Sequence, residues 1–267
     1  MPNHDNNLSE LTEKLVYFFD LDGTIYLGDK LFEGVLDLIE ILRTKKKKFY
    51  FLSNNSSKST TDYLKKLNNF NLDVSHDDLI LSQHPTMDYL KKNNYKKIFL
   101  LGTQSLKEEF KNEGFILTEE DPEILVLAFD QELTYDRLVK ASHLLQKEEF
   151  PYIATHLDNK CPTEEGFIPD AGGIAALLYR ATERSPRVFG KPNKEMLLFK
   201  LEQLGISPEN AVMFGDRLYT DIIMGIKAGV TTCCVLSGEM TMDMINKSEF
   251  KPDFVINGIW ELLNEFK

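Results

Sequence analysis

The chain has 267 residues, of which 42% are apolar and 27% are charged, a balance typical of globular proteins. This composition excludes a largely disordered chain, because it offers enough apolar surface to offset the entropy lost on folding. The net charge of −11 disfavours nucleic acids and anionic membrane surfaces as partners. No apolar stretch approaches the roughly 18 residues of a membrane-spanning helix, and the first residues show no export signal.

Cysteine usage points to a reducing compartment, and we therefore expect a cytoplasmic protein. Cys161, Cys233 and Cys234 are an odd number of cysteines without metal-ligand spacing. Cys233 and Cys234 stand in an apolar run and are expected to be small buried residues of a strand. A redox pair is the alternative, which would need a strained disulfide between chain neighbours.

The chain begins with alternating short apolar runs and amphipathic segments, the pattern of an α/β fold with parallel strands. Residues 15–19 and 49–52 predict two strands. Apolar residues at helical spacing predict a helix after each strand, one from residue 35 and one over residues 63–70.

A second α/β series begins near Ser82. Its strands are predicted at residues 98–101, 124–128 and 152–155, with helices between them. Residues 158–173 are rich in Gly and Pro and are predicted to form a loop, which leads into a helix over residues 174–179.

From residue 187 onward the first pattern returns, so that the two ends of the chain are expected to build one core. Its strands are predicted at residues 188–189, 211–214, 231–236 and 254–256.

Four short segments at predicted strand ends carry polar residues. In the first, Asp20 and Asp22 lie on the same side of the chain, about 7 Å apart along it. Gly23 then permits a sharp turn around a ligand, although a plain strand-to-turn junction is the alternative. In the second, Ser53 and Asn54 offer a hydroxyl and backbone N–H groups to a phosphate oxygen, or simply cap the next helix.

The third and fourth segments add a cation and two more carboxylates. Lys191 follows an apolar strand and stands between Gly190 and Pro192. It is either fixed in place to bind an anion or a solvated surface lysine. The P-loop pattern is absent from the sequence. Asp216 and Asp221 lie where a strand ends and a helix begins. They complement the helix dipole or, next to the first pair, complete an oxygen site suited to Mg²⁺.

Because parallel strands gather their carboxyl ends at one edge of a sheet, these four segments are expected to meet. In chain order they resemble the four motifs of the haloacid dehalogenase (HAD) superfamily, and the chain is most similar to its NagD/4-nitrophenylphosphatase branch. The resemblance implies a Rossmann-like parallel-sheet HAD core over residues 1–81 and 185–267. An α/β cap domain of type C2 would be inserted at residues 82–184.

The resemblance also implies a role for each matching residue. Asp20 would be the nucleophile and Asp22 the general acid and base. Mg²⁺ would be held by the Asp20 carboxylate, the Asp22 carbonyl and Asp216. The phosphoryl oxygens would be bound by Ser53, the Asn54 N–H and Lys191. Supporting positions are Gly23, Thr24 and Asp221, the last orienting metal-bound water or Lys191.

In the predicted cap, residues 154–158 resemble a T-N-x-D motif, but His156 replaces the usual Asn. Asp170 likewise stands where the branch has Gly. His156 and Asp158 are candidate leaving-group contacts; a histidine bonded within its own loop is the alternative.

The resemblance implies a Mg²⁺-dependent phosphatase that acts on small phosphomonoesters through an aspartyl-phosphate, such as nucleoside monophosphates, sugar or glycerol phosphates, phosphoglycolate and 4-nitrophenyl phosphate. Asp22 supports phosphoryl chemistry, because halide displacement needs no proton. A phosphotransferase or mutase, and a non-catalytic phospholigand-binding protein, are the alternatives. The resemblance also allows a homodimer.

Overall fold

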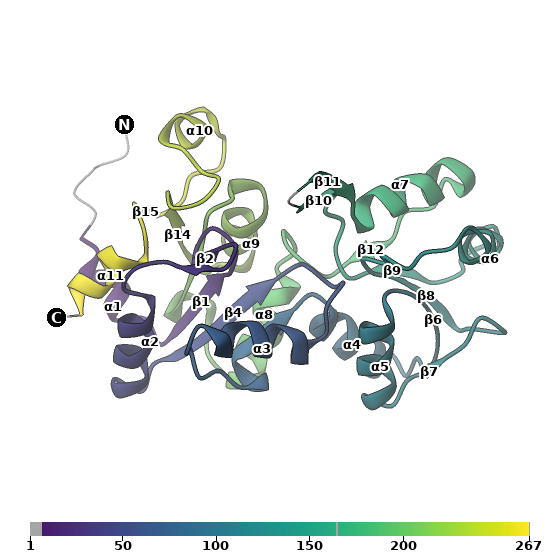
Figure 1. Ribbon diagram of the computed structural model, residues 1–267, viewed down its shortest axis with the longest axis horizontal. Helices are drawn as coiled ribbons and strands as arrows, with labels where there is room; N and C mark the ends of the chain where they lie inside the picture. Colours follow the sequence, from purple (N-terminus) through teal and green to yellow (C-terminus); the bar gives the residue numbers. More distant parts are fainter. Residues whose placement is uncertain (1–6, 164, 267) are drawn as a thin grey trace. The chain divides into compact units, whose positions relative to one another are not determined.

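The computed structural model describes residues 7–163 and 165–266, with the side chain of Pro162 excepted. The first six residues, part of the segment on which the prediction about export signals depended, lie outside this range. The described chain divides into two compact units (Figure 1). Unit 1 comprises Met1–Ser53, Leu64–Ile80 and Lys191–Lys267, and unit 2 comprises Asn54–Tyr63 and Leu81–Gly190.

Unit 1 is built on a six-stranded sheet in the order β15-β14-β13-β1-β4-β5. The strands β1, β4, β13, β14 and β15 pair in parallel. Their bounds are β1 (Val16–Asp20), β4 (Lys48–Ser53), β5 (Leu79–Leu81), β13 (Ala211–Gly215), β14 (Thr231–Val235) and β15 (Phe254–Ile256). The sheet confirms the prediction of a parallel α/β core, with β5 as an edge strand that the sequence pattern missed.

The central strand β1 is buried on both faces, as expected of a parallel sheet covered by helices on each side. On one face Val16 and Phe18 pack in a cluster with residues of α8 and α9. On the other face Tyr17 and Phe19 stack with Phe214 of β13. Cys233 and Cys234 are buried and free, which confirms that they are packing residues.

Several shorter elements complete unit 1. Its α-helices are α1 (Ser9–Thr12), α2 (Val35–Thr44), α8 (Glu195–Leu204), α9 (Ile223–Ala228), α10 (Met242–Lys247) and α11 (Ile259–Glu265), and α3 (Thr60–Asn69) crosses into it from unit 2. Helical turns occur at η1 (His76–Asp78), η2 (Pro208–Asn210) and the π-helix η3 (Leu218–Ile222). A small hairpin pairs β2 (Tyr26–Leu27) with β3 (Lys30–Leu31).

Unit 2 has its own parallel sheet, in the order β12-β9-β8-β6-β7. The strands are β6 (Lys97–Leu101), β7 (Ile116–Leu117), β8 (Ile124–Leu127), β9 (Tyr152–Ala154) and β12 (Arg187–Val188). Two apolar clusters, one around Ile98 and Leu100 and one around Phe99 and Leu101, pack against the helices. Those helices are α4 (Gln83–Lys92), α5 (Gln104–Asn112), α6 (Tyr135–Leu145) and α7 (Ala171–Thr182).

Two sequence predictions about this region were wrong. The predicted loop 158–173 contains an antiparallel hairpin of β10 (Lys160–Thr163) and β11 (Gly166–Pro169), and α7 begins at Ala171 rather than at 174. The strand near residues 188–189 was expected in the core but pairs with β9 in unit 2. A strand of two residues is too short for its apolar pattern to specify a sheet, so its backbone hydrogen bonds to β9 decide where it lies. Across residues 7–163 and 165–266, no helix is long and apolar enough to cross a membrane.

Candidate active site

Three neighbouring strands of unit 1 end in the predicted site residues. The sheet order β13-β1-β4 places the ends of these strands side by side. Asp20 ends β1, Ser53 ends β4, and Asp216 directly follows β13. The registers Phe19↔Phe214 and Asp20↔Leu52 keep the three ends level. A parallel sheet thus brings side chains from distant parts of the chain to one edge.

Lys191 is the cation of this edge. Its buried Nζ forms an ion pair with Asp20 Oδ1 and lies 2.8 Å from Asp221 Oδ1. Burial alone would lower the pKa of Lys191, but the charges of Asp20 and Asp221 outweigh it and raise the pKa. Lys191 therefore carries a charge at neutral pH and is fixed in place.

Three carboxylates surround this one ammonium. Asp20, Asp216 and Asp221 each offer an oxygen within 4.8 Å of the others. Burial and the charge of Asp20 raise the pKa of Asp216 to about 6. Burial raises the pKa of Asp221 to about 7, although the Lys191 ammonium acts to lower it. The site has more negative charge than its own lysine can balance.

Asp216 has an oxygen suited to a cation. Its Oδ2 accepts a hydrogen bond from the Glu239 backbone N–H at 2.7 Å. Its Oδ1 is buried and has no hydrogen-bond partner among the described residues. Carboxylate oxygens are the ligands that Mg²⁺ prefers, so Asp20 and Asp216 fit the predicted metal.

Glycines pack directly against these carboxylates. A Cβ at Gly23 would lie 2.3 Å from Asp216 Oδ2, and a Cβ at Gly238 only 2.0 Å from the same atom. A Cβ at Gly215 would lie 2.3 Å from the Cβ of Asp221. Only glycine fits at these three positions. Gly23 also has φ +89°, the left-handed backbone expected of its turn.

Asp22 lies two residues after Asp20 and differs from it in environment. Its side chain is exposed, but the protein around it reduces its hydration. This desolvation, together with the charge of Asp20, raises the pKa of Asp22. The Tyr26 hydroxyl donates to Asp22 Oδ2 at 3.3 Å, and Lys66 Nζ lies 3.9 Å from the centre of the Tyr26 ring. A raised pKa favours the protonated form, which an acid catalyst needs.

Other predicted residues divide between the units. Ser53 and Thr24 are buried in unit 1, and the Thr24 hydroxyl has no hydrogen-bond partner in the described chain. Asn54 belongs to unit 2, where its side-chain Nδ2 donates to Asp158 Oδ1 at 3.1 Å.

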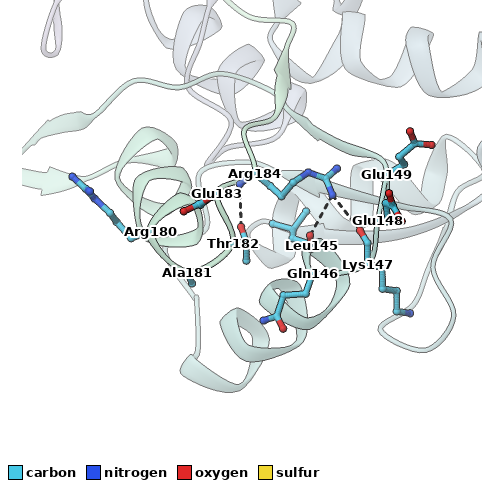
Figure 2. A pocket seen from close by; sticks show the side chains of 10 residues that line it. All are labelled: Leu145, Gln146, Lys147, Glu148, Glu149, Arg180, Ala181, Thr182, Glu183 and Arg184. Carbon is cyan, nitrogen blue, oxygen red and sulfur yellow. Dashed lines mark hydrogen bonds between the residues drawn. The ribbon is translucent and has the colours of Figure 1, made fainter.

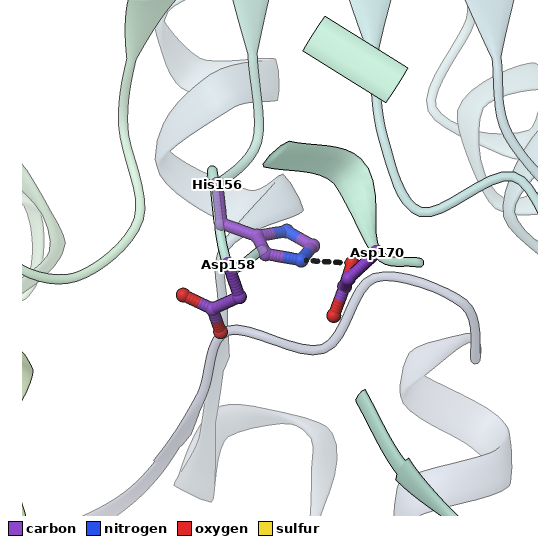
Figure 3. A group of neighbouring side chains, drawn as sticks. All are labelled: His156, Asp158 and Asp170. Atoms are coloured by element: carbon purple, nitrogen blue, oxygen red, sulfur yellow. Dashed lines mark hydrogen bonds and ion pairs between the residues drawn. The ribbon is translucent and has the colours of Figure 1, made fainter. Parts of the chain in front are cut away.

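His156 and Asp170 contact each other in unit 2 (Figure 3). His156 is the residue that replaces the Asn of the T-N-x-D pattern, and Asp170 is the residue that stands in place of a glycine. His156 is fully buried, and its Nε2 lies 2.9 Å from Asp170 Oδ1. Its Nδ1 lies 3.1 Å from Thr155 Oγ1 and 3.3 Å from Ser56 Oγ. Asp170 also accepts the Ala171 N–H at 2.5 Å and so caps α7. The contacts of His156 are thus made inside its own unit.

The loop after β14 supplies residues that sequence reasoning missed. Ser237 Oγ donates to the Gly23 carbonyl at 2.7 Å, Gly238 packs on Asp216, and Glu239 donates its N–H to Asp216. The signal available was a Ser-Gly pair at the end of a predicted strand, which marks a turn at the same edge of the sheet.

A surface pocket in unit 2 is separate from these clusters (Figure 2). It lies at the ends of α6 and α7, where Arg184 donates to the carbonyls of Leu145 and Lys147. None of the sequence-predicted site residues lines it.

Comparison with known proteins supports the resemblance. Residues 17–116 match the haloacid dehalogenase-like hydrolase family, and residues 188–262 match a second family described as HAD-hydrolase-like. The 4-nitrophenylphosphatase of Thermotoga maritima is 41% identical, with a TM-score of 0.92 over 98% of this chain and 100% of that one. NagD from Escherichia coli K-12 is 25% identical, with a TM-score of 0.86 over 93% and 98%. The acid sugar phosphatase of Staphylococcus aureus strain MRSA252 is 28% identical over 94% of this chain and 97% of its own.

Replacing Asp170 by Ala should destabilise the protein by about 2 kcal/mol, because buried His156 loses a partner and α7 loses its cap. Asp170→Asn keeps an acceptor and should retain most of the stability. Urea unfolding of both variants measures the difference. An Asp170→Ala protein as stable as wild type would contradict this role of the pair.

Mg²⁺ affinity should fall as the pH falls through about 6, the raised pKa of Asp216. A protonated carboxyl cannot bind the metal, so proton and metal compete for the same oxygen. Calorimetric titration at pH 7.5 and 5.5 should show a loss of about fourfold. Equal affinity at both values would mean that Asp216 is not the titrating ligand.

Proposed function

Because the chain belongs to the haloacid dehalogenase-like hydrolase family, we propose that it is a Mg²⁺-dependent phosphatase of small phosphomonoesters. The observation that carries the proposal is the buried Asp216 Oδ1, which has no hydrogen-bond partner among the described residues and lies beside the ion-paired Asp20 and Lys191. The names of the relatives favour sugar phosphates and 4-nitrophenyl phosphate as substrates. Nucleoside monophosphates, glycerol phosphate and phosphoglycolate belong to the same proposed class.

Asp20 is the proposed nucleophile. Its carboxylate oxygen attacks phosphorus, the bond from phosphorus to the ester oxygen breaks, and an aspartyl-phosphate forms. Lys191 holds the Asp20 carboxylate by its ion pair, which limits the orientations of the attacking oxygen.

Asp22 is the proposed general acid. In its protonated form it gives a proton to the departing ester oxygen, and its raised pKa favours that form. The resulting carboxylate then takes a proton from the water that attacks phosphorus. The bond from phosphorus to the Asp20 oxygen breaks, inorganic phosphate is released, and Asp22 returns to its protonated state. Tyr26 orients Asp22 through its hydroxyl.

The transferring phosphoryl group needs positive charge and donors around it. Asp20, the Asp22 carbonyl and Asp216 would hold Mg²⁺, and a bound Mg²⁺ neutralises charge that builds up on the phosphoryl oxygens. Lys191, the Ser53 hydroxyl and the Asn54 N–H are the proposed donors to those oxygens. Asp221 positions Lys191, from which it lies 2.8 Å away.

We propose that residues 82–184, which lie within unit 2, form the cap, with His156 and Asp158 as its candidate substrate contacts. A cap of this size would exclude macromolecular esters, which is our reason for proposing small substrates. The boundaries at residues 82 and 184 are part of this proposal, and so is the homodimer.

Asp20→Asn should abolish hydrolysis of 4-nitrophenyl phosphate, because it keeps the side-chain shape and removes the nucleophilic charge. EDTA should abolish it too, and added Mg²⁺ should restore it in wild type alone. Release of 4-nitrophenolate measures turnover. Equal rates in wild type and variant would overturn the proposal. Phosphate transfer to added alcohols in preference to water would favour a phosphotransferase.

Asp22→Asn should reduce the turnover of different substrates to different extents, depending on the leaving group. An alkoxide from a sugar phosphate needs a proton, so its turnover should fall by about 10²-fold or more. 4-Nitrophenolate leaves readily without one, and its formation should fall less. Comparison of kcat for both esters measures the split, and equal losses would contradict the acid role.

A further inference from the structure

The loop that follows β14 touches the predicted metal site from outside the four motifs. Ser237 binds the Gly23 carbonyl, and the Glu239 N–H donates to Asp216 Oδ2 at 2.7 Å. This backbone N–H directs Oδ2 away from metal ligation and leaves Oδ1 as the oxygen without a hydrogen-bond partner among the described residues. The orientation of Asp216 therefore depends on where this loop places one N–H group.

The Glu239 side chain is held by two residues that follow Asp216 along the chain. Arg217 Nε lies 3.1 Å from Glu239 Oε2, and the Tyr219 hydroxyl lies 2.9 and 3.1 Å from the two carboxylate oxygens. Arg217 also donates its backbone N–H to Asp221 Oδ2 at 3.2 Å. A closed ring results, from Asp216 through Arg217 to Glu239 and back to Asp216.

We propose that Glu239 is a positioning residue for the metal site, and this inference rests on the proposed function. Its carboxylate, clamped by Arg217 and Tyr219, fixes the loop whose N–H orients Asp216. The clamp is needed because this loop contains Gly238, a residue with large conformational freedom, at its closest approach to Asp216. Glu239 does not itself touch the metal or the substrate.

The Glu239 carboxylate also fixes the position of the Arg217 guanidinium, whose positive charge competes with Mg²⁺ for the carboxylates of the site. The Arg217 guanidinium lies close enough to Asp20 and Asp216 for those carboxylates to raise its pKa against the effect of burial. Among the described residues, its ion pair is with Glu239. Glu239 thus holds this cation in a fixed place while Asp216 Oδ1 stays open to Mg²⁺.

The test is calorimetric titration of Mg²⁺ into the full chain without substrate, so that the readout is binding and not turnover. Glu239→Ala should raise the Kd for Mg²⁺ about tenfold, as expected when a residue that orients a ligand is lost. Glu239→Gln keeps an acceptor of the same length and should stay within about threefold of wild type. The urea midpoint in EDTA should be unchanged in both, because the clamp lies at the surface.

Glu249→Ala is the matched control, because it removes the same charge from an exposed position for which no ion pair is seen in the described chain. Its Kd should equal that of wild type. The inference is overturned if Glu239→Ala binds Mg²⁺ as wild type does. It is also overturned if Glu239→Gln is as weak as Glu239→Ala, since charge and not position would then be the cause. Wild type that binds no Mg²⁺ would remove the metal site and thus the proposed function itself.

Discussion

The surplus of negative charge at the carboxyl edge of the six-stranded sheet is the constraint on which the candidate site depends. Asp20, Asp216 and Asp221 present oxygens within 4.8 Å of one another, with Lys191 as the ammonium that pairs with two of them. Two like charges at such a distance repel by about 3 kcal/mol at an effective dielectric constant near 20. Burial, together with this repulsion, raises the pKa values of Asp216 and Asp221, and a divalent cation would relieve the repulsion.

The fold supplies what is needed to hold such a repulsive arrangement in place. β1 is buried on both faces, so its backbone cannot yield to the charges at its end. Tyr17 and Phe19 stack against Phe214, which ties the strand that bears Asp20 to the strand that precedes Asp216. Gly23 and Gly238 then let two backbone segments approach the Asp216 carboxylate more closely than any side chain would allow. The rigid strands and the closely packed glycines thus act together to hold the carboxylates in place.

Much of this was open to prediction from the sequence, and the reasons differ from residue to residue. Asp20 and Asp216 follow short apolar runs, and the rule that parallel strands share a carboxyl edge brings them together without further information. β12 was misplaced because a strand of two residues carries no pattern that specifies its sheet. The contact of His156 with Asp170, 14 residues away, follows from the hairpin that the Gly- and Pro-rich stretch concealed. Glu239 acts on Asp216 through a backbone N–H, which every residue except proline possesses, so its residue type gave no signal.

Two polar clusters of the described residues also show what separates a candidate metal site from a structural network. His156, Asp158 and Asp170 have ligand atoms as close together as those of Asp20, Asp216 and Asp221. Both ring nitrogens of His156 are engaged, however, and each of the two carboxylates accepts a hydrogen bond inside unit 2. A satisfied buried network stiffens its surroundings and gains nothing from an ion. Asp216 Oδ1 instead remains buried without a partner in the described chain, a cost of about 1–3 kcal/mol that a bound cation would remove. The unsatisfied oxygen, more than the proximity of acidic residues, is therefore our reason for proposing the metal site at the edge of unit 1.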